Sequence, residues 1–152
     1  MKVELKLQPG LEEPKVVIVA GEETAQLKQL IAHLSKLDLA PIPALDGERT
    51  VLLQREDILR FYADGKGVCA QTAKGVYTVR LRLYELEARL DGHTFVRISN
   101  SEIINLKQIT ALDLKLSGTI RITLEGGVTT YASRRYVKKI KEALGLGKGG
   151  AP

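Results

Sequence analysis

The chain has no tryptophan, two phenylalanines and one cysteine among its 152 residues. Proteins that stack single-stranded bases depend on aromatic platforms, so this scarcity argues against that class of nucleic-acid binder. The lone Cys69 excludes an internal disulfide and suits a reducing compartment. The longest apolar run, Val16 to Ala20, is too short to span a bilayer, and the alternating start predicts no secretory signal. These absences favour a cytoplasmic chain of one domain with a small appendage.

Residues that carry enzyme chemistry are sparse as well. His33 and His93 share no local spacing typical of metal ligands, and a single cysteine cannot complete a zinc site. No serine lies in a nucleophile elbow, and no glycine-rich nucleotide-binding loop follows the apolar run at residues 16–20. The sequence therefore predicts no enzymatic activity, no metal and no cofactor.

Positive charge is concentrated in the C-terminal two-thirds of the chain. Residues 1–47 contain 5 Lys/Arg and 7 Asp/Glu, whereas residues 48–152 contain 18 and 11, a net charge of +7. Such an excess favours a polyanionic partner, with nucleic acid first and an anionic membrane surface second. A basic domain without such a partner has the same composition, so charge alone leaves both interpretations open.

Residues 1–47 predict a strand–strand–helix extension. Residues 2–8 alternate in polarity like a strand with one wet face, and residues 15–20 predict a buried strand. Residues 21–37 predict an amphipathic helix whose apolar stripe consists of Leu27, Leu30, Ile31, Leu34 and Leu37. This stripe packs either on the two strands or on a second copy of the chain. Residues 40–48, rich in proline and glycine, predict the link to the next domain.

Residues 48–147 predict a mostly β domain with short helices, and residues 148–152 predict a flexible tail. A tight turn at 64–67 predicts a hairpin. In the middle of this domain, residues 81–90 switch to helical periodicity. Strands are predicted at 57–63, 67–72, 74–81, 94–99 and 128–132, and a hairpin at 111–124 that sets Leu112, Leu114 and Leu116 opposite Ile120, Ile122 and Leu124.

The segment FVRISNSEIINLKQI (95–109) delivers polar groups at the tip of a predicted strand. Ser99 and Glu102 fit a capping box, which predicts a short helix through Leu106. Asparagine can also pair bidentately with adenine, and serine hydroxyls suit phosphate oxygens. The same structure can serve as a helix cap and as a nucleic-acid contact, so both interpretations stay open at this point.

The segment TYASRRYVKKIKEALG (130–145) predicts a basic amphipathic helix with Ser133 as N-cap and Gly145 as stop. Arg134 and Arg135 fall in its first turn, where the helix macrodipole disfavours positive charge. Helix stability therefore does not explain these arginines, which predict an anionic partner. A helical projection separates an apolar face from a basic ridge, formed respectively by Val137, Ile140 and Leu144 and by Arg134, Arg135, Lys138, Lys139 and Lys141.

These two segments, with alternating strands between them, resemble the LytTR family of bacterial transcription regulators over about residues 50–146. The resemblance implies an α+β, predominantly β fold of small sheets with short helices. It implies binding to double-stranded DNA through loops inserted into successive major grooves. Stand-alone members have a short N-terminal extension in place of a receiver domain, as residues 1–47 do here. Paired DNA repeats, a homodimer on DNA and a small membrane-protein regulator are further implied partners.

Carried over residue by residue, the resemblance assigns base reading to Asn100 and Arg135. A third contact loop corresponds to residues 64–68, where Val68 replaces the polar or histidine reader of some members and argues against base reading. The resemblance assigns phosphate contacts to Ser101, Arg134, Lys138 and Lys139, and Arg97 and Ser99 are added as phosphate or supporting residues. Lys66 can reach a phosphate or a guanine edge, and an ordinary turn lysine explains it equally well. The competing interpretation is a basic module that docks on an acidic protein or an anionic membrane, and base-capable side chains at loop tips favour DNA over it.

Overall fold

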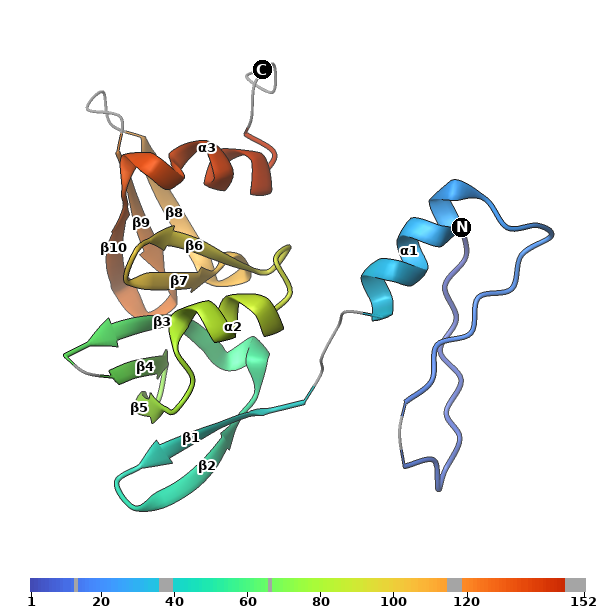
Figure 1. The fold of residues 1–152 in the computed structure, drawn as a ribbon, viewed down its shortest axis with the longest axis horizontal. Helices are drawn as coiled ribbons and strands as arrows, with labels where there is room; N and C mark the ends of the chain where they lie inside the picture. Colours follow the sequence, from blue (N-terminus) through green and yellow to red (C-terminus); the bar gives the residue numbers. More distant parts are fainter. Residues whose placement is uncertain (13, 36–39, 66, 115–118, 147–152) are drawn as a thin grey trace. The chain divides into compact units, whose positions relative to one another are not determined.

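The computed structural model describes residues 1–12, 14–35, 40–65, 67–114 and 119–146. It divides into two compact units, residues 1–34 and 35–152, which are treated separately below. Three α-helices and ten strands are described, and the strands form a seven-stranded and a three-stranded antiparallel sheet. The expected predominantly β architecture with short helices is confirmed (Figure 1).

The first unit contains α1 (Ala25–Ser35) and no strand among its described residues. The two strands predicted at 2–8 and 15–20 are therefore wrong in this structure, where side chains such as Val3 and Val19 are 86% and 92% exposed. Two isolated strands without a further layer to pack on are marginal in water, which explains why neither the alternation of residues 2–8 nor the apolar run of residues 15–20 sufficed.

Helix α1 begins later than predicted because Thr24 caps it, accepting a hydrogen bond from the Leu27 backbone N–H at 3.2 Å. None of its residues is fully buried. Of the predicted stripe, Ile31 is exposed, and Leu37 lies outside the described residues. The stripe is thus without a core of its own within the first unit.

The larger sheet of the second unit has the strand order β2-β1-β5-β4-β3-β7-β6. Neighbouring pairs are antiparallel throughout, and the turn between β3 and β4 is the hairpin predicted at 64–67. The strands are β1 (Ile42–Asp46), β2 (Arg49–Leu53), β3 (Ile58–Asp64), β4 (Gly67–Thr72), β5 (Gly75–Val79), β6 (Phe95–Ser99) and β7 (Glu102–Asn105).

The stretch expected to be a link, residues 40–48, instead contributes β1 to this sheet. Gly47 turns the chain into β2 with a φ of 66°, a conformation that glycine adopts at no steric cost. Pro43 lacks an N–H group, and β1 pairs with β5 through Leu45 and Thr78. The strand that contains Pro43 therefore pairs with β5 through one residue pair only. The sheet begins at Ile42, before the predicted domain boundary at residue 48.

The smaller sheet has the order β10-β9-β8. The hairpin predicted at 111–124 is confirmed, and the described residues of the two apolar sets face each other, with Leu112 opposite Ile122 and Leu114 opposite Ile120. Leu116 lies outside the described residues. The strands are β8 (Ile109–Leu114), β9 (Ile120–Leu124) and β10 (Val128–Ala132), and short 3₁₀ turns cover Arg55–Asp57, Leu106–Gln108 and Glu125–Gly127.

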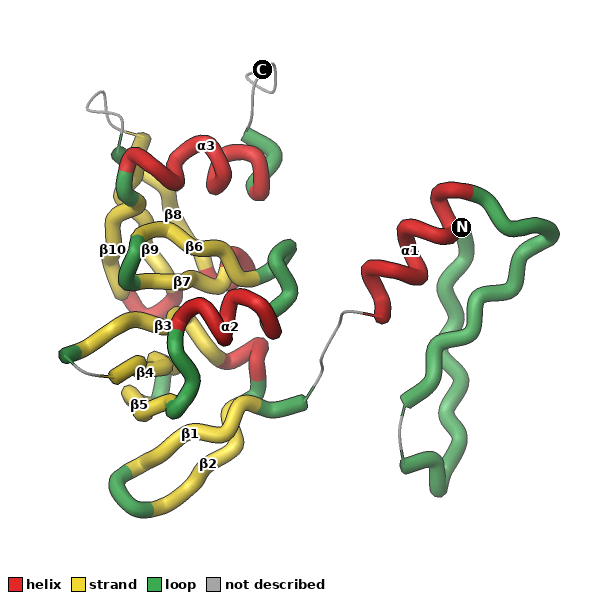
Figure 2. The backbone as a smooth tube through the Cα atoms, viewed as in Figure 1, coloured by secondary structure: helices red, strands yellow, loops and turns green. Residues whose placement is uncertain are grey.

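Helices α2 (Leu83–Arg89) and α3 (Arg134–Ala143) flank the β6–β7 hairpin, as Figure 2 shows in red. The apolar face of α2 is buried through Leu83 and Leu86 against the core that contains Phe61. The apolar face of α3 is buried through Ile140 against a second core, which includes Ile98 of β6. Each helix therefore packs one face on the sheets, and the β6–β7 hairpin lies between them.

Candidate nucleic-acid interface

The β6–β7 turn is a tight hairpin turn rather than the start of a helix. After Ser99 and Asn100 the chain continues directly into β7, so the capping-box helix expected from Ser99 and Glu102 is wrong. The Ser101 backbone N–H donates to Ser99 Oγ at 3.2 Å, and the Ala63 N–H at the end of β3 donates to the Ser101 carbonyl at 2.8 Å. The turn is fixed both within itself and to the neighbouring strand.

Glu102 points inward, away from the turn. One carboxylate oxygen lies 3.1 Å from Arg60 Nη1 and the other accepts from Thr130 Oγ1 at 2.8 Å. Thr130 belongs to the smaller sheet, so this carboxylate ties the base of the turn to both sheets. The charged side chain that resembled a helix cap in the sequence therefore anchors the hairpin from below.

Arg97 holds the turn in place from the side. Its Nε donates to the Ser99 carbonyl at 2.8 Å and its Nη2 to the Asn100 carbonyl at 2.7 Å, while Nη1 lies 3.4 Å from Glu87 of α2. The side chain is 15% exposed. Because its donors are engaged inside the protein, we interpret Arg97 as a residue that positions Asn100.

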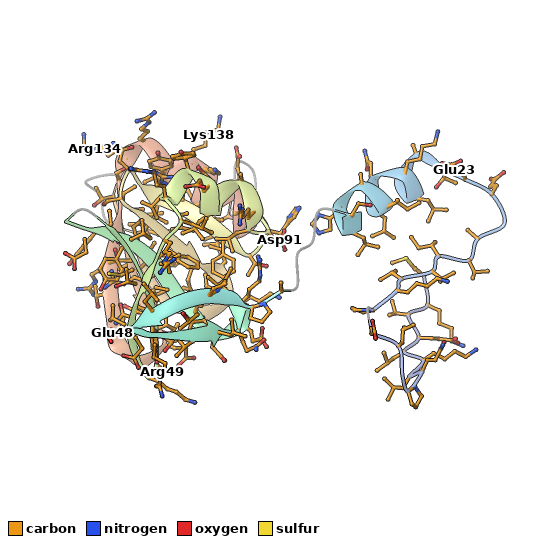
Figure 3. The ribbon with its side chains drawn as sticks, turned by 60° about the horizontal axis from the view of Figure 1, so that its bottom comes forward. Glu23, Glu48, Arg49, Asp91, Arg134 and Lys138 are labelled. Atoms are coloured by element: carbon orange, nitrogen blue, oxygen red, sulfur yellow. The ribbon has the colours of Figure 1, made fainter. Side chains whose placement is uncertain are left out.

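Helix α3 begins directly beside this turn. The Ser133 backbone N–H, at the N-cap position, donates to the Ile98 carbonyl of β6 at 2.9 Å, and the Ser133 hydroxyl makes no capping bond. The first turn of α3 is thus positioned by the same strand that carries Asn100. Arg134 and Lys138 are exposed, and Figure 3 shows both at one end of this unit with Arg49 toward the opposite end.

Asn100 and Arg135, predicted as base readers, are brought together although they lie 35 residues apart. Asn100 Oδ1 accepts from Arg135 Nη1 at 3.5 Å and from the Tyr136 hydroxyl at 3.3 Å. The Arg135 guanidinium lies 5.7 Å from the centre of the Tyr136 ring, a cation–π distance. Both predicted readers are exposed, so an amide and a guanidinium stand side by side on the surface.

Sequence reasoning missed two residues of this site, Tyr136 and Glu87. Tyr136 holds both predicted readers, and its only signal was its place next to Arg135 at the edge of the apolar face of α3. Glu87 of α2 contacts Arg97 and lies 3.7 Å from Lys139 Nζ. No local pattern predicts these pairings because they join separate elements. Lys139 is therefore partly neutralised, unlike Arg134 and Lys138.

The β3–β4 turn forms the other side of a groove of about 400 Å³ whose lining includes Gly65, Gly67, Arg97 and Asn100. Lys66 lies outside the described residues. Val68 is buried and pairs with Val79 of β5, so it is not available to a base. The presence of valine at position 68, in place of a polar or histidine residue, is consistent with the burial of this side chain in the core.

The sequence of residues 48–145 matches the model of the LytTr DNA-binding domain. The chain belongs to the LytTR family. This LytTR chain is 35% identical over 148 residues to a protein named as an uncharacterized HTH-type transcriptional regulator of Staphylococcus aureus strain COL, covering 96% of this chain and 99% of the relative. The counterpart from strain MRSA252 is 34% identical with the same coverage.

The fold of the LytTR chain matches that of a solved LytTr DNA-binding domain from Bacillus cereus. The TM-score is 0.67 at 19% identity, over 70% of this chain and 97% of that one. In the described part of our chain, strands separate all three α-helices, so no helix-turn-helix is formed there. The exposed polar groups of this LytTR domain are instead presented by a hairpin turn and by the first turn of a single helix. Among the described residues, no helix is long and apolar enough to cross a membrane.

Proposed function

We propose that this LytTR chain is a sequence-specific double-stranded DNA-binding transcription regulator that reads bases with Asn100 and Arg135. One observation carries the proposal: an amide and a guanidinium from distant segments meet at 3.5 Å on an exposed surface. These are the side chains that pair bidentately with adenine and with guanine in the major groove. The β6–β7 turn and the first turn of α3 would therefore enter the DNA together.

The surrounding residues fit the role of phosphate contacts. Arg134 and Lys138 are exposed on the same helix as Arg135 and can reach the DNA backbone without carrying sequence information. Ser101 presents a hydroxyl at the same turn, and Lys139 contributes less because Glu87 lies close to it. Lys66 of the β3–β4 turn is proposed as a further phosphate contact, and Ser99 as a supporting residue.

The contact between the two proposed readers holds them at one place on the surface, and Asn100 Oδ1 exchanges a bond from Arg135 or Tyr136 for one from adenine when it pairs with the base. Arg135 can only donate hydrogen bonds, so its approach turns the Oδ1 side of Asn100 toward α3. The cation–π contact with the Tyr136 ring, at 5.7 Å, limits the conformations of the Arg135 side chain. Ordering both side chains before binding reduces the entropy that complex formation costs.

The proposal is tested by selecting bound sequences from a random duplex pool and titrating the selected duplex with salt. If about five to eight phosphates are contacted, the logarithm of affinity should fall against the logarithm of salt with a slope of roughly −5 to −7. A flat titration, or no selected duplex at low salt, would end the DNA proposal and favour docking on an acidic protein or an anionic membrane.

We further propose that the first unit serves assembly rather than sequence choice. The helix α1 has an apolar stripe without a core of its own, and a second copy of the chain could cover it. A homodimer would suit paired DNA repeats in a bacterial cytoplasm, and a small membrane protein could act through the same segment. Replacing Leu30 and Leu34 together by Asp should then weaken dimerisation, measured by light scattering, and leave the selected half-site unchanged. Altered base preference in this variant would contradict the assignment.

A further inference from the structure

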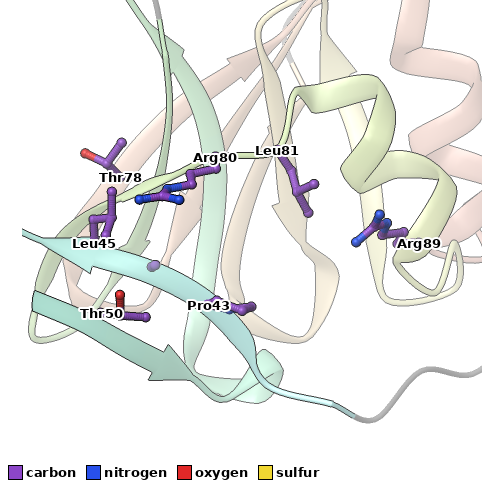
Figure 4. A pocket seen from close by; sticks show the side chains of 8 residues that line it. Pro43, Leu45, Thr50, Thr78, Arg80, Leu81 and Arg89 are labelled. Carbon is purple, nitrogen blue, oxygen red and sulfur yellow. The ribbon is translucent and has the colours of Figure 1, made fainter.

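A second concave site lies away from the residues assigned to base reading. It is a pocket of about 320 Å³ between the β1–β2 hairpin, the end of β5 and α2. Its apolar lining includes Pro43, Leu45 and Leu81, and two guanidinium groups complete it, those of Arg80 and Arg89. Figure 4 shows these two arginines on either side of Leu81. The volume is at the lower end of the range typical of small-molecule sites.

The two arginines of this pocket lack acidic partners in the described part of the chain. Neither Arg80 nor Arg89 makes an ion pair there, although Glu85 stands at the i−4 position from Arg89 and the spacing favours a pair. Glu85 instead accepts a hydrogen bond from the Arg82 backbone N–H at 3.2 Å, at the start of α2. The positive charge at the pocket is therefore not compensated by its nearest helical neighbour.

We propose that this pocket binds a small amphipathic carboxylate, with its hydrocarbon body on the apolar lining and its charged head in the positive field of Arg80 and Arg89, two exposed arginines on either side of Leu81. Guanidinium groups present forked donors that match the geometry of a carboxylate. The hydroxyl-bearing Thr50 and Thr78 also line the pocket and offer further polar contacts to the head group. An apolar lining contributes nothing to inorganic anions, so the hydrocarbon body distinguishes this ligand class from free phosphate.

The binding proposal is tested by isothermal titration calorimetry of the full chain with octanoate, below its micelle-forming concentration, and with octanol as the uncharged comparison. We expect octanoate to bind saturably. Octanol should bind at least about tenfold more weakly, because it cannot make the charge-assisted hydrogen bonds. Arg80→Gln and Arg89→Gln should each weaken octanoate binding about tenfold or more. Arg49→Gln, which removes an exposed arginine from the β1–β2 turn, should leave it unchanged.

Three results would overturn the proposal: no saturable octanoate binding, equal affinity for octanol, or equal weakening by Arg49→Gln. A melting temperature measured for each variant separates loss of the site from loss of the fold. Coverage of the pocket by another part of the chain would appear as absence of octanoate binding and counts against the proposal.

Arg80 also lines the groove that includes Asn100, so the pocket adjoins the proposed DNA surface. Resting on the proposed function, we expect saturating octanoate to make the salt dependence of DNA binding shallower by about one, the contribution of one phosphate contact. Octanoate binding without any change in DNA affinity would overturn this regulatory step. Failure of the octanoate-free protein to bind DNA would instead overturn the proposed function.

Discussion

Replacing Arg97 by Gln tests whether this residue positions the reader Asn100 or contacts DNA itself. Its guanidinium donates to the Ser99 and Asn100 carbonyls at 2.8 and 2.7 Å from a side chain that is 15% exposed. Hydrogen bonds to charged groups contribute about 1.5–3 kcal/mol each, less where solvent competes. We therefore expect Arg97→Gln to cost about 2 kcal/mol in the free energy of unfolding, or roughly 5–10 °C in melting temperature.

Arg97→Gln should lower the sequence selectivity of DNA binding more than the overall affinity for DNA. With the turn loosened, Asn100 loses its fixed approach to a base, and discrimination of about 1–3 kcal/mol, roughly five- to a hundredfold, should be lost. The assay compares affinity for a selected and a scrambled duplex, at a temperature where the variant is folded.

Arg134→Gln is the matched control for this experiment because it removes the same charge from an exposed position in the first turn of α3. It should weaken both duplexes equally and leave the melting temperature nearly unchanged. If Arg97→Gln and Arg134→Gln behave alike in both measurements, Arg97 is a phosphate contact and its positioning role is refuted.

Three further changes probe the site and its support. Asn100→Asp keeps an acceptor for Arg135 but places a negative charge at the DNA surface, so DNA binding should be lost in a mobility-shift assay with little change in melting temperature; unfolding would contradict this. Glu102→Gln leaves the Arg60 charge without its partner and should cost about 2–3 kcal/mol in urea unfolding, whereas a cost below roughly 0.5 kcal/mol would refute the anchoring role. Burial raises the pKa of the Cys69 thiol from its usual value, so iodoacetamide at pH 8 should modify the folded chain more slowly than the unfolded chain, and equal rates would argue against burial.

The same thiol contributes to the pH dependence of the free energy of unfolding. Because the pKa of Cys69 is raised by burial in the folded state, the unfolded chain releases this proton at lower pH. The contribution of the protonated thiol to stability is therefore fully present below the unfolded pKa and is lost as pH rises through the folded pKa.

Sequence patterns succeeded where local periodicity and burial agree. The hairpin at 111–124 was predictable because apolar residues alternate along both strands, and a slip by one residue would turn them to the other face. Helix α3 was predictable for the same reason, since Ile140 is fully buried while Arg134 and Lys138 on the other face are exposed.

Patterns failed where tertiary contacts decide the structure. The alternating residues 2–8 and the continuous apolar run at 15–20 found no layer to pack on, whereas the proline-containing β1 pairs with β2. Within the site, the family resemblance proposed Asn100 and Arg135 as base readers, and the structure places their side chains 3.5 Å apart. Around these residues, the bond from Tyr136 to Asn100 spans 36 residues and the pair of Arg97 with Glu87 spans 10, so no local spacing predicts either contact. The bond from Arg97 to the Asn100 carbonyl is local, three residues apart, and depends on the hairpin turn itself.

The central claim is that Arg135 reads a base whereas Lys138, one helical turn away, contacts only phosphate. The decisive measurement is the ratio of affinities for a selected and a scrambled duplex in Arg135→Ala and Lys138→Ala. We predict that Arg135→Ala lowers this ratio about five- to a hundredfold, while Lys138→Ala weakens both duplexes equally and makes the salt slope shallower by about one. An unchanged ratio in Arg135→Ala would contradict the assignment of the site.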